Sequence, residues 1–308
     1  MGAESQETHG GCPVVHTDYR PNRPFGSYYK LLDAEREQFP VLYNDATGDP
    51  YWMIQRHDHV LEAFHTPEVF SNEVVQAINW RDAIFFLPNQ VNNPEHANLR
   101  RLLNRWFAPA AVRKAEPLFI EHCNRLIDDF IGDGSCDFVA EFAIRYPTDL
   151  LLQILGMPVE DGPQMVKWVE AIFGGAFGGE GGFASVDAIK AYYDTALDSR
   201  LHDDRDPQTD FLTYLLNAEI DGEKLSRETL LTICMTMMTA GLDTTRSALG
   251  YIFQYLATHD DDRRRLAENP DIIPAAVEEF VRLNNLIMQS GRLVTKDVEF
   301  HGASMKAG

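Results

Sequence analysis

The sequence feature that most constrains this chain is one long apolar stretch, LLTICMTMMTAGLDTTRSALGYIFQYLATH, over residues 230–259. Ser226 stands before it, where a hydroxyl can accept backbone N–H bonds at a helix start, and Glu228 suits the first turn. At about 1.5 Å per residue, a helix of this length spans roughly 45 Å, the width of a domain. Apolar residues surround most of its circumference, which predicts a helix buried on all sides. Asp243 in its middle therefore needs partners, because an unpaired buried carboxylate is costly.

Composition limits the class of protein to which the chain can belong. It has 308 residues, of which 44% are hydrophobic and 24% charged, so it is globular and can bury a large core. No run of eighteen uncharged apolar residues exists, and the N-terminus lacks the basic flank and apolar core of a secretory signal. Four irregularly spaced cysteines suit reduced thiols, so we expect a cytoplasmic protein without a membrane anchor. A net charge of −20 argues against binding to nucleic acid or anionic membranes.

Hydrophobic periodicity predicts a mainly α protein with small β-hairpins around the long central helix. Residues 1–24 are expected to be a loose N-terminal lead-in, and 25–308 a single domain. Pro117 is placed to start a helix at its first turn. Short strands are expected at 41–43 and 51–54 as one hairpin, with further strands in 292–306. Besides the central helix, the predicted helices are 28–39, 58–64, 94–106, 117–130, 138–155, 164–173, 185–202, 210–219, 263–268 and 273–283.

A glycine-rich stretch, GGAFGGEGG over residues 174–182, separates two of these helices. Gly179, Gly181 and Ala184 match a dinucleotide-binding fingerprint by letters, and a dinucleotide-dependent oxidoreductase is a hypothesis that rests on this match alone. The fingerprint needs a strand before it and a βαβ frame, whereas a helix precedes it here. We therefore predict a hinge or lid, since glycines tolerate the backbone changes of opening.

The central helix carries the first candidate for chemistry. Gly241 weakens the helix locally and hydroxyl groups can replace a lost backbone bond, so we expect a widening or kink beside Thr244 that can hold water and a small ligand. The alternative is that Asp243 and Thr244 form a buried polar pair bonded to a neighbouring loop.

Three further groups of charged residues are weaker candidates. His96 and Arg100 are four residues apart on one helix face, which suits a carboxylate or phosphate ligand, although a solvated basic turn has the same pattern. Glu279 and Arg282 can pair at i, i+3, a common surface arrangement that contributes about 0.2–0.5 kcal/mol. Arg292 stands before the terminal strands, where a surface arginine is ordinary.

Taken in order, these motifs resemble those of the cytochrome P-450 haem-thiolate monooxygenases of the soluble bacterial type. The order is His96-x-x-x-Arg100, Ala240-Gly241-x-Asp243-Thr244-Thr245, Glu279-x-x-Arg282 and Arg292 before VTKDVEFHG. The segment YWMIQRHDHVLEAFHTPEVFSN is similar to the family's first hairpin, next helix and following turn. The likeness runs from about residue 25 to the end of the chain.

The resemblance implies a cofactor, haem b (iron protoporphyrin IX), and residues that hold it. His96, Arg100 and Arg292 match the positions that bind the haem propionates, as expected of cationic and donor groups facing carboxylates. Ala240 and Gly241 match the point where the central helix passes over the haem and leaves room for O₂.

The resemblance also implies the residues of the reaction and of the pocket. Asp243 and Thr244 match the acid and the alcohol that relay protons during O₂ activation. Glu279 and Arg282 match a structural ion pair that supports the haem-binding core. The expected substrate-lining residues are Thr236, Thr239 and Met288.

One departure from the family concerns the iron. The family's axial ligand is a cysteine in a glycine-rich loop well after the position of Arg292, and none of Cys12, Cys123, Cys136 and Cys234 matches it. No metal ligand is therefore assigned within the chain, and the axial cysteine is expected beyond Gly308. We expect the 308 residues to be inactive without that loop.

The leading hypothesis is a haem-dependent monooxygenase that hydroxylates a small lipophilic substrate. It would use O₂ and two electrons from a ferredoxin-type donor and act as a monomer. The alternative hypothesis is a non-catalytic helical protein that binds a small molecule in the same apolar pocket.

Overall fold

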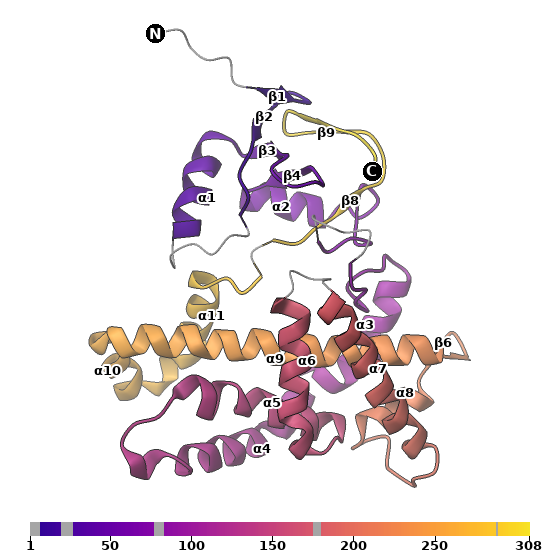
Figure 1. Ribbon diagram of the computed structural model, residues 1–308, viewed down its shortest axis with the longest axis vertical. Coiled ribbons are helices and arrows are strands. Elements are labelled where there is room, and N and C mark those ends of the chain that lie inside the picture. The colour runs from indigo at the N-terminus through magenta and orange to yellow at the C-terminus, as the bar shows by residue number, and fades with distance from the viewer. Residues whose placement is uncertain (1–6, 20–26, 77–82, 175–179, 288) are drawn as a thin grey trace. The chain divides into compact units, whose positions relative to one another are not determined.

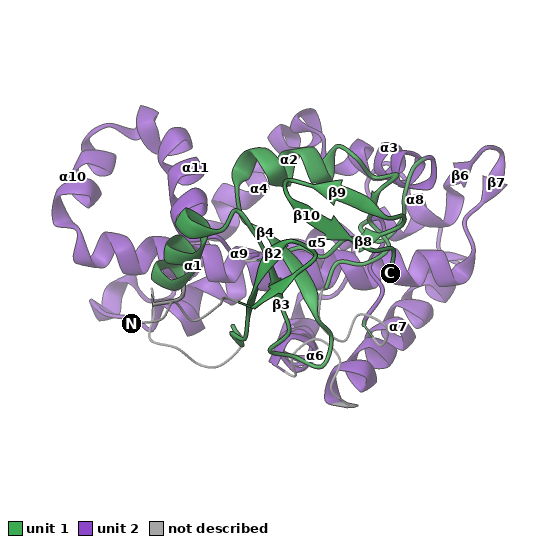
Figure 2. Cartoon of the chain, turned by 90° about the horizontal axis from the view of Figure 1, so that it is seen from above, with its two compact units in different colours: residues 1–83, 89–93, 289–308 green, residues 84–88, 94–288 purple. Residues whose placement is uncertain are grey.

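A computed structural model of the protein describes residues 7–19, 27–76, 83–174, 180–287 and 289–308. The chain divides into two compact units, which are distinguished by colour in Figure 2. Unit 1 consists of residues 1–83, 89–93 and 289–308, and unit 2 of residues 84–88 and 94–288. The predicted mainly α fold with small sheets is confirmed. Within the described residues, no helix combines the length and the apolarity needed to cross a bilayer.

Unit 2 is built from helices, with the longest, α9, running through the others (Figure 1). Helices α5, α6 and α7 all pack against α9. A π-helical turn, Val139–Ala143, leads into α5, and a short hairpin pairs β6 (Glu219–Ile220) with β7 (Glu223–Lys224). The helices are α3 (Glu95–Phe107), α4 (Pro109–Asp128), α5 (Arg145–Leu155), α6 (Gly162–Gly174), α7 (Glu180–Arg200), α8 (Phe211–Asn217), α9 (Arg227–Thr258), α10 (Asp260–Glu268) and α11 (Ile273–Leu283).

Helix α9 begins where the sequence predicts. The Ser226 hydroxyl accepts a hydrogen bond from the backbone N–H of Thr229 at 3.1 Å and caps a helix of 32 residues. The predicted burial on all sides holds only for its first half, where almost every residue from Leu230 to Leu242 is buried. From Asp243 onward each residue is partly or fully exposed. The apolar composition of the second half therefore does not reflect burial within the described part of the chain.

Unit 1 is organised by a four-stranded sheet in the order β1-β2-β3-β4. The predicted hairpin is confirmed as β3 (Val41–Asn44) and β4 (Tyr51–Ile54), paired antiparallel. The other elements are β1 (Thr8–His9), β2 (Cys12–Val15), α1 (Ser27–Gln38), α2 (His57–Phe64), β5 (Phe70–Ser71), β8 (Leu293–Val294), β9 (Val298–Phe300) and β10 (Ala303–Met305).

The expectation of a loose lead-in over residues 1–24 is wrong for its middle part. Strand β2 pairs in parallel with β3, and the Cys12 side chain is buried in the core of unit 1 with Val41, Phe70 and Phe300. Short strands without strong periodicity gain their order from this long-range pairing, which local sequence does not encode. The boundary at residue 25, and a single domain from there to 308, remain predictions.

The helix predicted to start at Pro117 starts earlier. Helix α4 begins at Pro109, which takes the first-turn position, and Pro117 lies inside the helix. Proline lacks an N–H group, so the helix loses one hydrogen bond at this point and continues past it.

The glycine-rich stretch is only partly described. Gly174 ends α6, whereas residues 175–179, including Gly179, lie outside the described residues, so the predicted lid remains a prediction. Helix α7 begins at Glu180, five residues before the predicted start at 185. A Cβ added at Gly182 would lie 3.6 Å from the Ala171 carbonyl oxygen, so α7 packs closely on α6 here. The described element directly before the fingerprint is helix α6 and not a strand, which removes the basis of the dinucleotide hypothesis.

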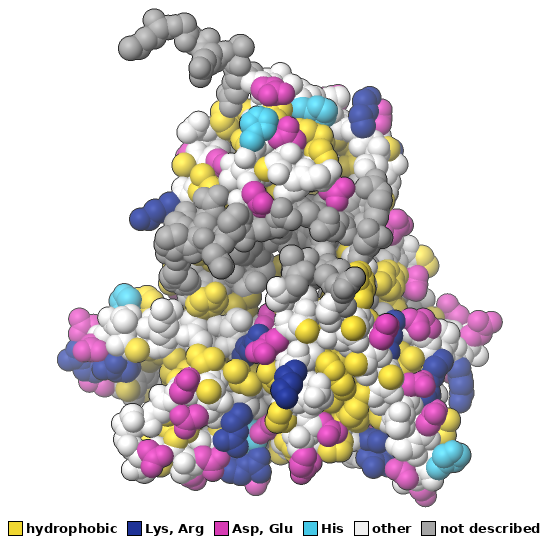
Figure 3. All heavy atoms as spheres, viewed as in Figure 1, with side chains coloured by type: hydrophobic (Ala, Val, Ile, Leu, Met, Phe, Trp, Pro, Cys, Tyr) yellow, Lys and Arg dark blue, Asp and Glu magenta, His cyan; other side chains and the backbone are white. Residues whose placement is uncertain are grey.

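Large apolar side chains remain exposed on several helices of unit 2. Figure 3 shows hydrophobic side chains gathered over this unit between scattered charges. Helix α11 has no buried residue, and Ile273, Val277 and Val281 on it are each more than two fifths exposed. Helix α4 buries only His122 and Leu126.

A buried ionic cluster joins the N-terminus of α8 to the end of α5. Asp210 caps α8 by accepting the Thr213 N–H at 2.8 Å, and its other oxygen lies 3.5 Å from Arg200 Nη2 and 3.2 Å from Arg205 Nη1. Arg200 also donates to the carbonyl oxygen of Gly156. Burial acts to raise the pKa of Asp210, but these donors outweigh it and hold the pKa below its usual value. The carboxylate thus stabilises the fold above about pH 4, and this contribution is lost as the pH falls through the lowered pKa.

Replacing Asp210 by Ala is expected to lower the free energy of unfolding by about 3 kcal/mol, because Arg200 is left buried without its carboxylate and α8 loses its cap. Urea unfolding followed by circular dichroism measures this. Asp204→Ala, at an exposed neighbouring position, should change stability by less than about 0.5 kcal/mol. Equal stability of the two variants would contradict the structural role of the cluster.

Candidate functional site

Asp243 on α9 has its partners on helices. Its Oδ1 accepts hydrogen bonds from Arg246 Nε at 3.1 Å and Nη2 at 2.8 Å, and Arg246 Nη1 donates to Glu170 Oε1 on α6 at 2.8 Å. The alternative of a pair bonded to a neighbouring loop is therefore wrong. Within the described residues Oδ2 has no protein partner. The Asp243 side chain is 28% exposed, so one carboxylate oxygen is free to exchange hydrogen bonds with water or a ligand.

Thr244 follows directly and is partly exposed. Its hydroxyl donates to the Ala240 carbonyl oxygen at 2.6 Å, and Ala240 itself is exposed. Helix α9 continues through Gly241 without interruption, so the widening or kink expected there is not seen. The Thr244 hydroxyl is the donor in this hydrogen bond, so the lone pairs of the hydroxyl oxygen remain available to accept one.

Gly241 has a packing role that the sequence did not suggest. A Cβ added there would lie 3.1 Å from Leu151 Cδ2 on α5, tighter than ordinary van der Waals contact. Glycine at this position lets α5 and α9 approach closely. The structure thus places Ala240 on an open part of α9 and Gly241 against α5.

The two described residues expected to line the pocket are buried. Thr236 donates to the Thr232 carbonyl oxygen at 2.8 Å and accepts the backbone N–H of Leu87 at 3.2 Å. Thr239 donates to carbonyl oxygens one turn back on the same helix. The sequence did not predict that the buried segment around Leu87 belongs to the site. Leu87 and Thr236, which it contacts, are 149 residues apart in the sequence. Met288 lies outside the described residues.

His96 and Arg100 lie in the first two turns of α3, as predicted. His96 is half-buried and Arg100 exposed, and neither has a hydrogen-bond or ion-pair partner among the residues that the structure describes. Burial, with a smaller effect of the Arg100 charge, lowers the pKa of His96. Two unpaired donors on one helix face fit an anionic ligand better than a structural role.

Arg292 belongs to unit 1 and is half-buried, so it is not the ordinary surface arginine of the default interpretation. Its guanidinium lies over the Phe64 ring at 4.5 Å, and Nη1 donates to Ser290 Oγ at 2.9 Å and the Gly291 carbonyl oxygen at 2.6 Å. Its Nε is shielded from solvent and has no partner in the described part of the chain. Burial lowers the pKa of this guanidinium.

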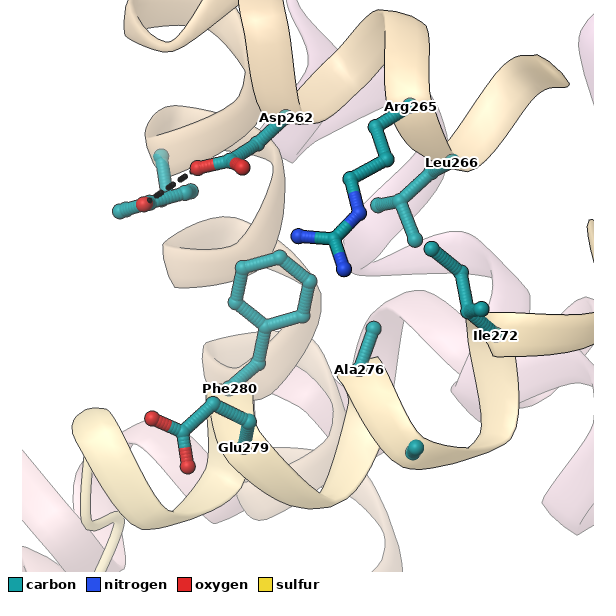
Figure 4. A pocket seen from close by; sticks show the side chains of 9 residues that line it. Asp262, Arg265, Leu266, Ile272, Ala276, Glu279 and Phe280 are labelled. Carbon is teal, nitrogen blue, oxygen red and sulfur yellow. Dashed lines mark hydrogen bonds between the residues drawn. The ribbon is translucent and has the colours of Figure 1, made fainter. Parts of the chain in front are cut away.

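Glu279 and Arg282 form the predicted ion pair on α11. Arg282 Nε and Nη2 donate to the two carboxylate oxygens of Glu279 at 2.7 and 2.6 Å, and both side chains are exposed. Figure 4 shows Glu279 at the edge of a cavity of about 370 Å³ between α10 and α11. Phe280, Leu266 and Ile272 supply its apolar walls, and Arg265 extends toward it. No sequence pattern indicates this cavity, since it depends on how two helices meet.

The unpaired donors fit the carboxylates of a haem. Arg292 presents a buried Nε without a partner among the described residues, as a group that waits for an anion would. The half-buried His96 and the exposed Arg100 also have no partner among those residues. The thiols do not suggest an iron ligand: Cys12 and Cys234 are buried, and burial raises the pKa of Cys234 to about 12. Among the described residues, no group of three or more His, Cys, Asp or Glu side chains could hold a metal ion.

Comparison with known proteins points to one family. The model of the family described as "Cytochrome P450" matches residues 181–308. Cytochrome P450 CYP107DY1 of Priestia megaterium is 26% identical over 299 residues, which cover 91% of this chain and 73% of the relative. Vitamin D(3) 25-hydroxylase of Pseudonocardia autotrophica is 28% identical over 292 residues, covering 89% and 69%. The crystal structure of CYP101J2 aligns with a TM-score of 0.85 at 26% identity, over 98% of this chain and 76% of that one.

The close approach of α5 and α9 can be tested with two valine variants. Gly241→Val should lower the free energy of unfolding by about 1–3 kcal/mol, because its side chain must displace Leu151. Gly250→Val is the matched control in the same helix, where no atom lies within 4 Å of an added Cβ, and it should not be destabilising. Urea unfolding measures both, and the same stability for both variants would refute the assigned packing.

Proposed function

Because the chain belongs to the cytochrome P450 family, whose members are haem monooxygenases, we propose that it hydroxylates a small lipophilic molecule with O₂ and two electrons from a redox partner. The observation that carries this proposal is the set of unpartnered donors, His96, Arg100 and Arg292, at the positions expected to meet haem propionates. Haem supplies the iron that activates O₂ when it is bound.

The chain's own residues would bind the cofactor and handle protons. His96 and Arg100 would donate to propionate oxygens from α3, and Arg292 would do so from unit 1. The hydroxyl of Thr244, now bonded to the Ala240 carbonyl oxygen at 2.6 Å, would turn to donate toward O₂. Asp243, held through Oδ1 by Arg246, would pass protons from water through Oδ2.

An apolar substrate agrees with the buried half of α9. Thr236 and Thr239 spend their hydroxyls on carbonyl oxygens of the helix, so they would present mainly their methyl groups to a ligand. A relative named as a vitamin D(3) 25-hydroxylase shows the kind of lipophile that such a protein oxidises. The alternative, a non-catalytic binding protein, would hold a small molecule in the same apolar pocket without oxidising it.

The electron donor, oligomeric state and location are also part of the proposal. A ferredoxin-type donor is small and acidic, and the exposed Arg101 and Arg105 of α3, with Arg113 and Lys114 of α4, supply cations on a chain that is otherwise acidic. We propose that the protein works as a monomer in the cytoplasm. The Glu279–Arg282 pair would support the haem-binding core from α11.

The iron ligand is expected from residues that follow Gly308 in the gene, since none of the four cysteines suits this role. The experiment that tests the function is the absorbance spectrum of the reduced, carbon-monoxide-treated protein expressed with those residues. A Soret band at the position of thiolate-ligated haem is expected. Absence of this band in the haem-loaded protein would contradict the monooxygenase.

Thr244→Ala is expected to uncouple electron use from product formation, because the hydroxyl that delivers the proton is missing. The measurement is the amount of hydrogen peroxide released per NADH oxidised by the same extended protein. This ratio should rise several-fold in the variant. Thr244→Ser should restore coupling. Thr258→Ala, which removes a similar helix-bonded hydroxyl near the end of α9, is the control. Unchanged peroxide yield in Thr244→Ala would remove the proton-relay role.

A further inference from the structure

Gln76 and Arg292 lie on adjoining segments of unit 1, and each has a buried side-chain nitrogen without a partner among the described residues, as Gln55 and His59 of the same unit also do. The side-chain nitrogens Gln76 Nε2 and Arg292 Nε are both shielded from solvent, and neither has a hydrogen-bond partner in the described part of the chain. Buried donors are almost always paired, because an unpaired one keeps the full desolvation penalty. Two such donors on adjoining segments indicate that a ligand supplies the acceptor.

The backbone holds these two segments side by side. Strand β5 pairs antiparallel with β8, Phe70 opposite Val294 and Ser71 opposite Leu293. Beyond this pair, the N–H of Gly291 donates to the Val75 carbonyl oxygen at 2.8 Å.

Gly291 makes this approach possible. A Cβ added at Gly291 would lie 2.9 Å from the backbone nitrogen and carbonyl carbon of Gln76, closer than real Cβ contacts come. The residue before Arg292 is thus in direct backbone contact with Gln76. A side chain at position 291 would force the two backbone segments apart.

Arg292 is fixed in orientation by contacts that leave Nε unused. Its Nη1 bonds Ser290 Oγ and the Gly291 carbonyl oxygen, and Phe64 covers its face. A guanidinium held in this way presents its remaining N–H groups in a plane, which matches a carboxylate.

We infer that the side-chain amide of Gln76 is a second donor to the carboxylate that Arg292 binds, and so a positioning residue for the haem. This inference rests on the proposed function, in which the carboxylate is a haem propionate. Arg292 supplies the charge, and Gln76 supplies a neutral N–H that helps to fix where the carboxylate lies. A carboxylate on a free small molecule has the same chemistry, and the test separates the two sources.

The test is a titration of the protein expressed with the residues that follow Gly308, using haem and haem dimethyl ester and followed by Soret absorbance. Gln76→Leu removes the donor and should weaken haem binding about fivefold, equivalent to about 1 kcal/mol. Gln76→Glu places a negative charge there and should weaken it more than tenfold. Both variants should bind the dimethyl ester, which has no ionised carboxylate, as the wild type does.

Gln55→Leu is the matched control. Gln55 also has a buried Nε2 without a partner in unit 1, but it follows β4 instead of adjoining Arg292, so its loss should leave both titrations unchanged. Circular dichroism establishes that each variant is folded, and Gln76→Glu serves if Gln76→Leu is not.

Three results would overturn the inference. If haem affinity is unchanged in both Gln76 variants, the Gln76 amide binds another ligand, such as a free carboxylate, and not the haem. An equal loss with the dimethyl ester indicates a general packing defect. Failure of the wild-type extended protein to bind haem at all overturns the inference together with the proposed function, whereas the first two results overturn the inference alone.

Discussion

The burial of the first half of α9 is the constraint on which the rest of unit 2 depends. Residues from Leu230 to Leu242 are almost all buried, and α5, α6 and α7 pack around them. At about 25 cal/mol per Å² of apolar surface removed from water, this helix is a major source of the unit's stability. Gly241 lets α5 come close at the end of the buried half. Asp243 and Thr244 follow immediately, where the helix becomes accessible.

At this position the polar residues of α9 avoid the cost of full burial and can be reached from solvent. A carboxylate at the fully buried position of Met238 would lie in the apolar core. At Asp243 it meets Arg246 and, through it, Glu170 of α6, and one of its oxygens has no partner among the described residues. The proposed proton relay would thus lie where the helix changes from buried to accessible.

The candidate donors differ from Asp243, because they lack hydrogen-bond partners among the described residues. His96, Arg100, Arg292 and Gln76 all present nitrogens that no described residue satisfies. The nitrogens of Arg292 and Gln76 are buried, and proteins rarely leave buried donors unpaired, whereas His96 is half-buried and Arg100 exposed. A carboxylate ligand would satisfy donors of this kind.

The sequence by itself determined the helix content, the cap at Ser226, the hairpin of β3 and β4 and the order of motifs that marks the family. These depend on local spacing, capping and turns, which a single stretch of chain encodes. Only the tertiary structure decided that β2 joins the sheet beside β3, that Pro117 lies within a helix, that Gly241 packs on Leu151 and that Gln76 adjoins Arg292. Each of these features depends on which distant segment of the chain packs against the residue. Local periodicity does not encode the free energy of such contacts.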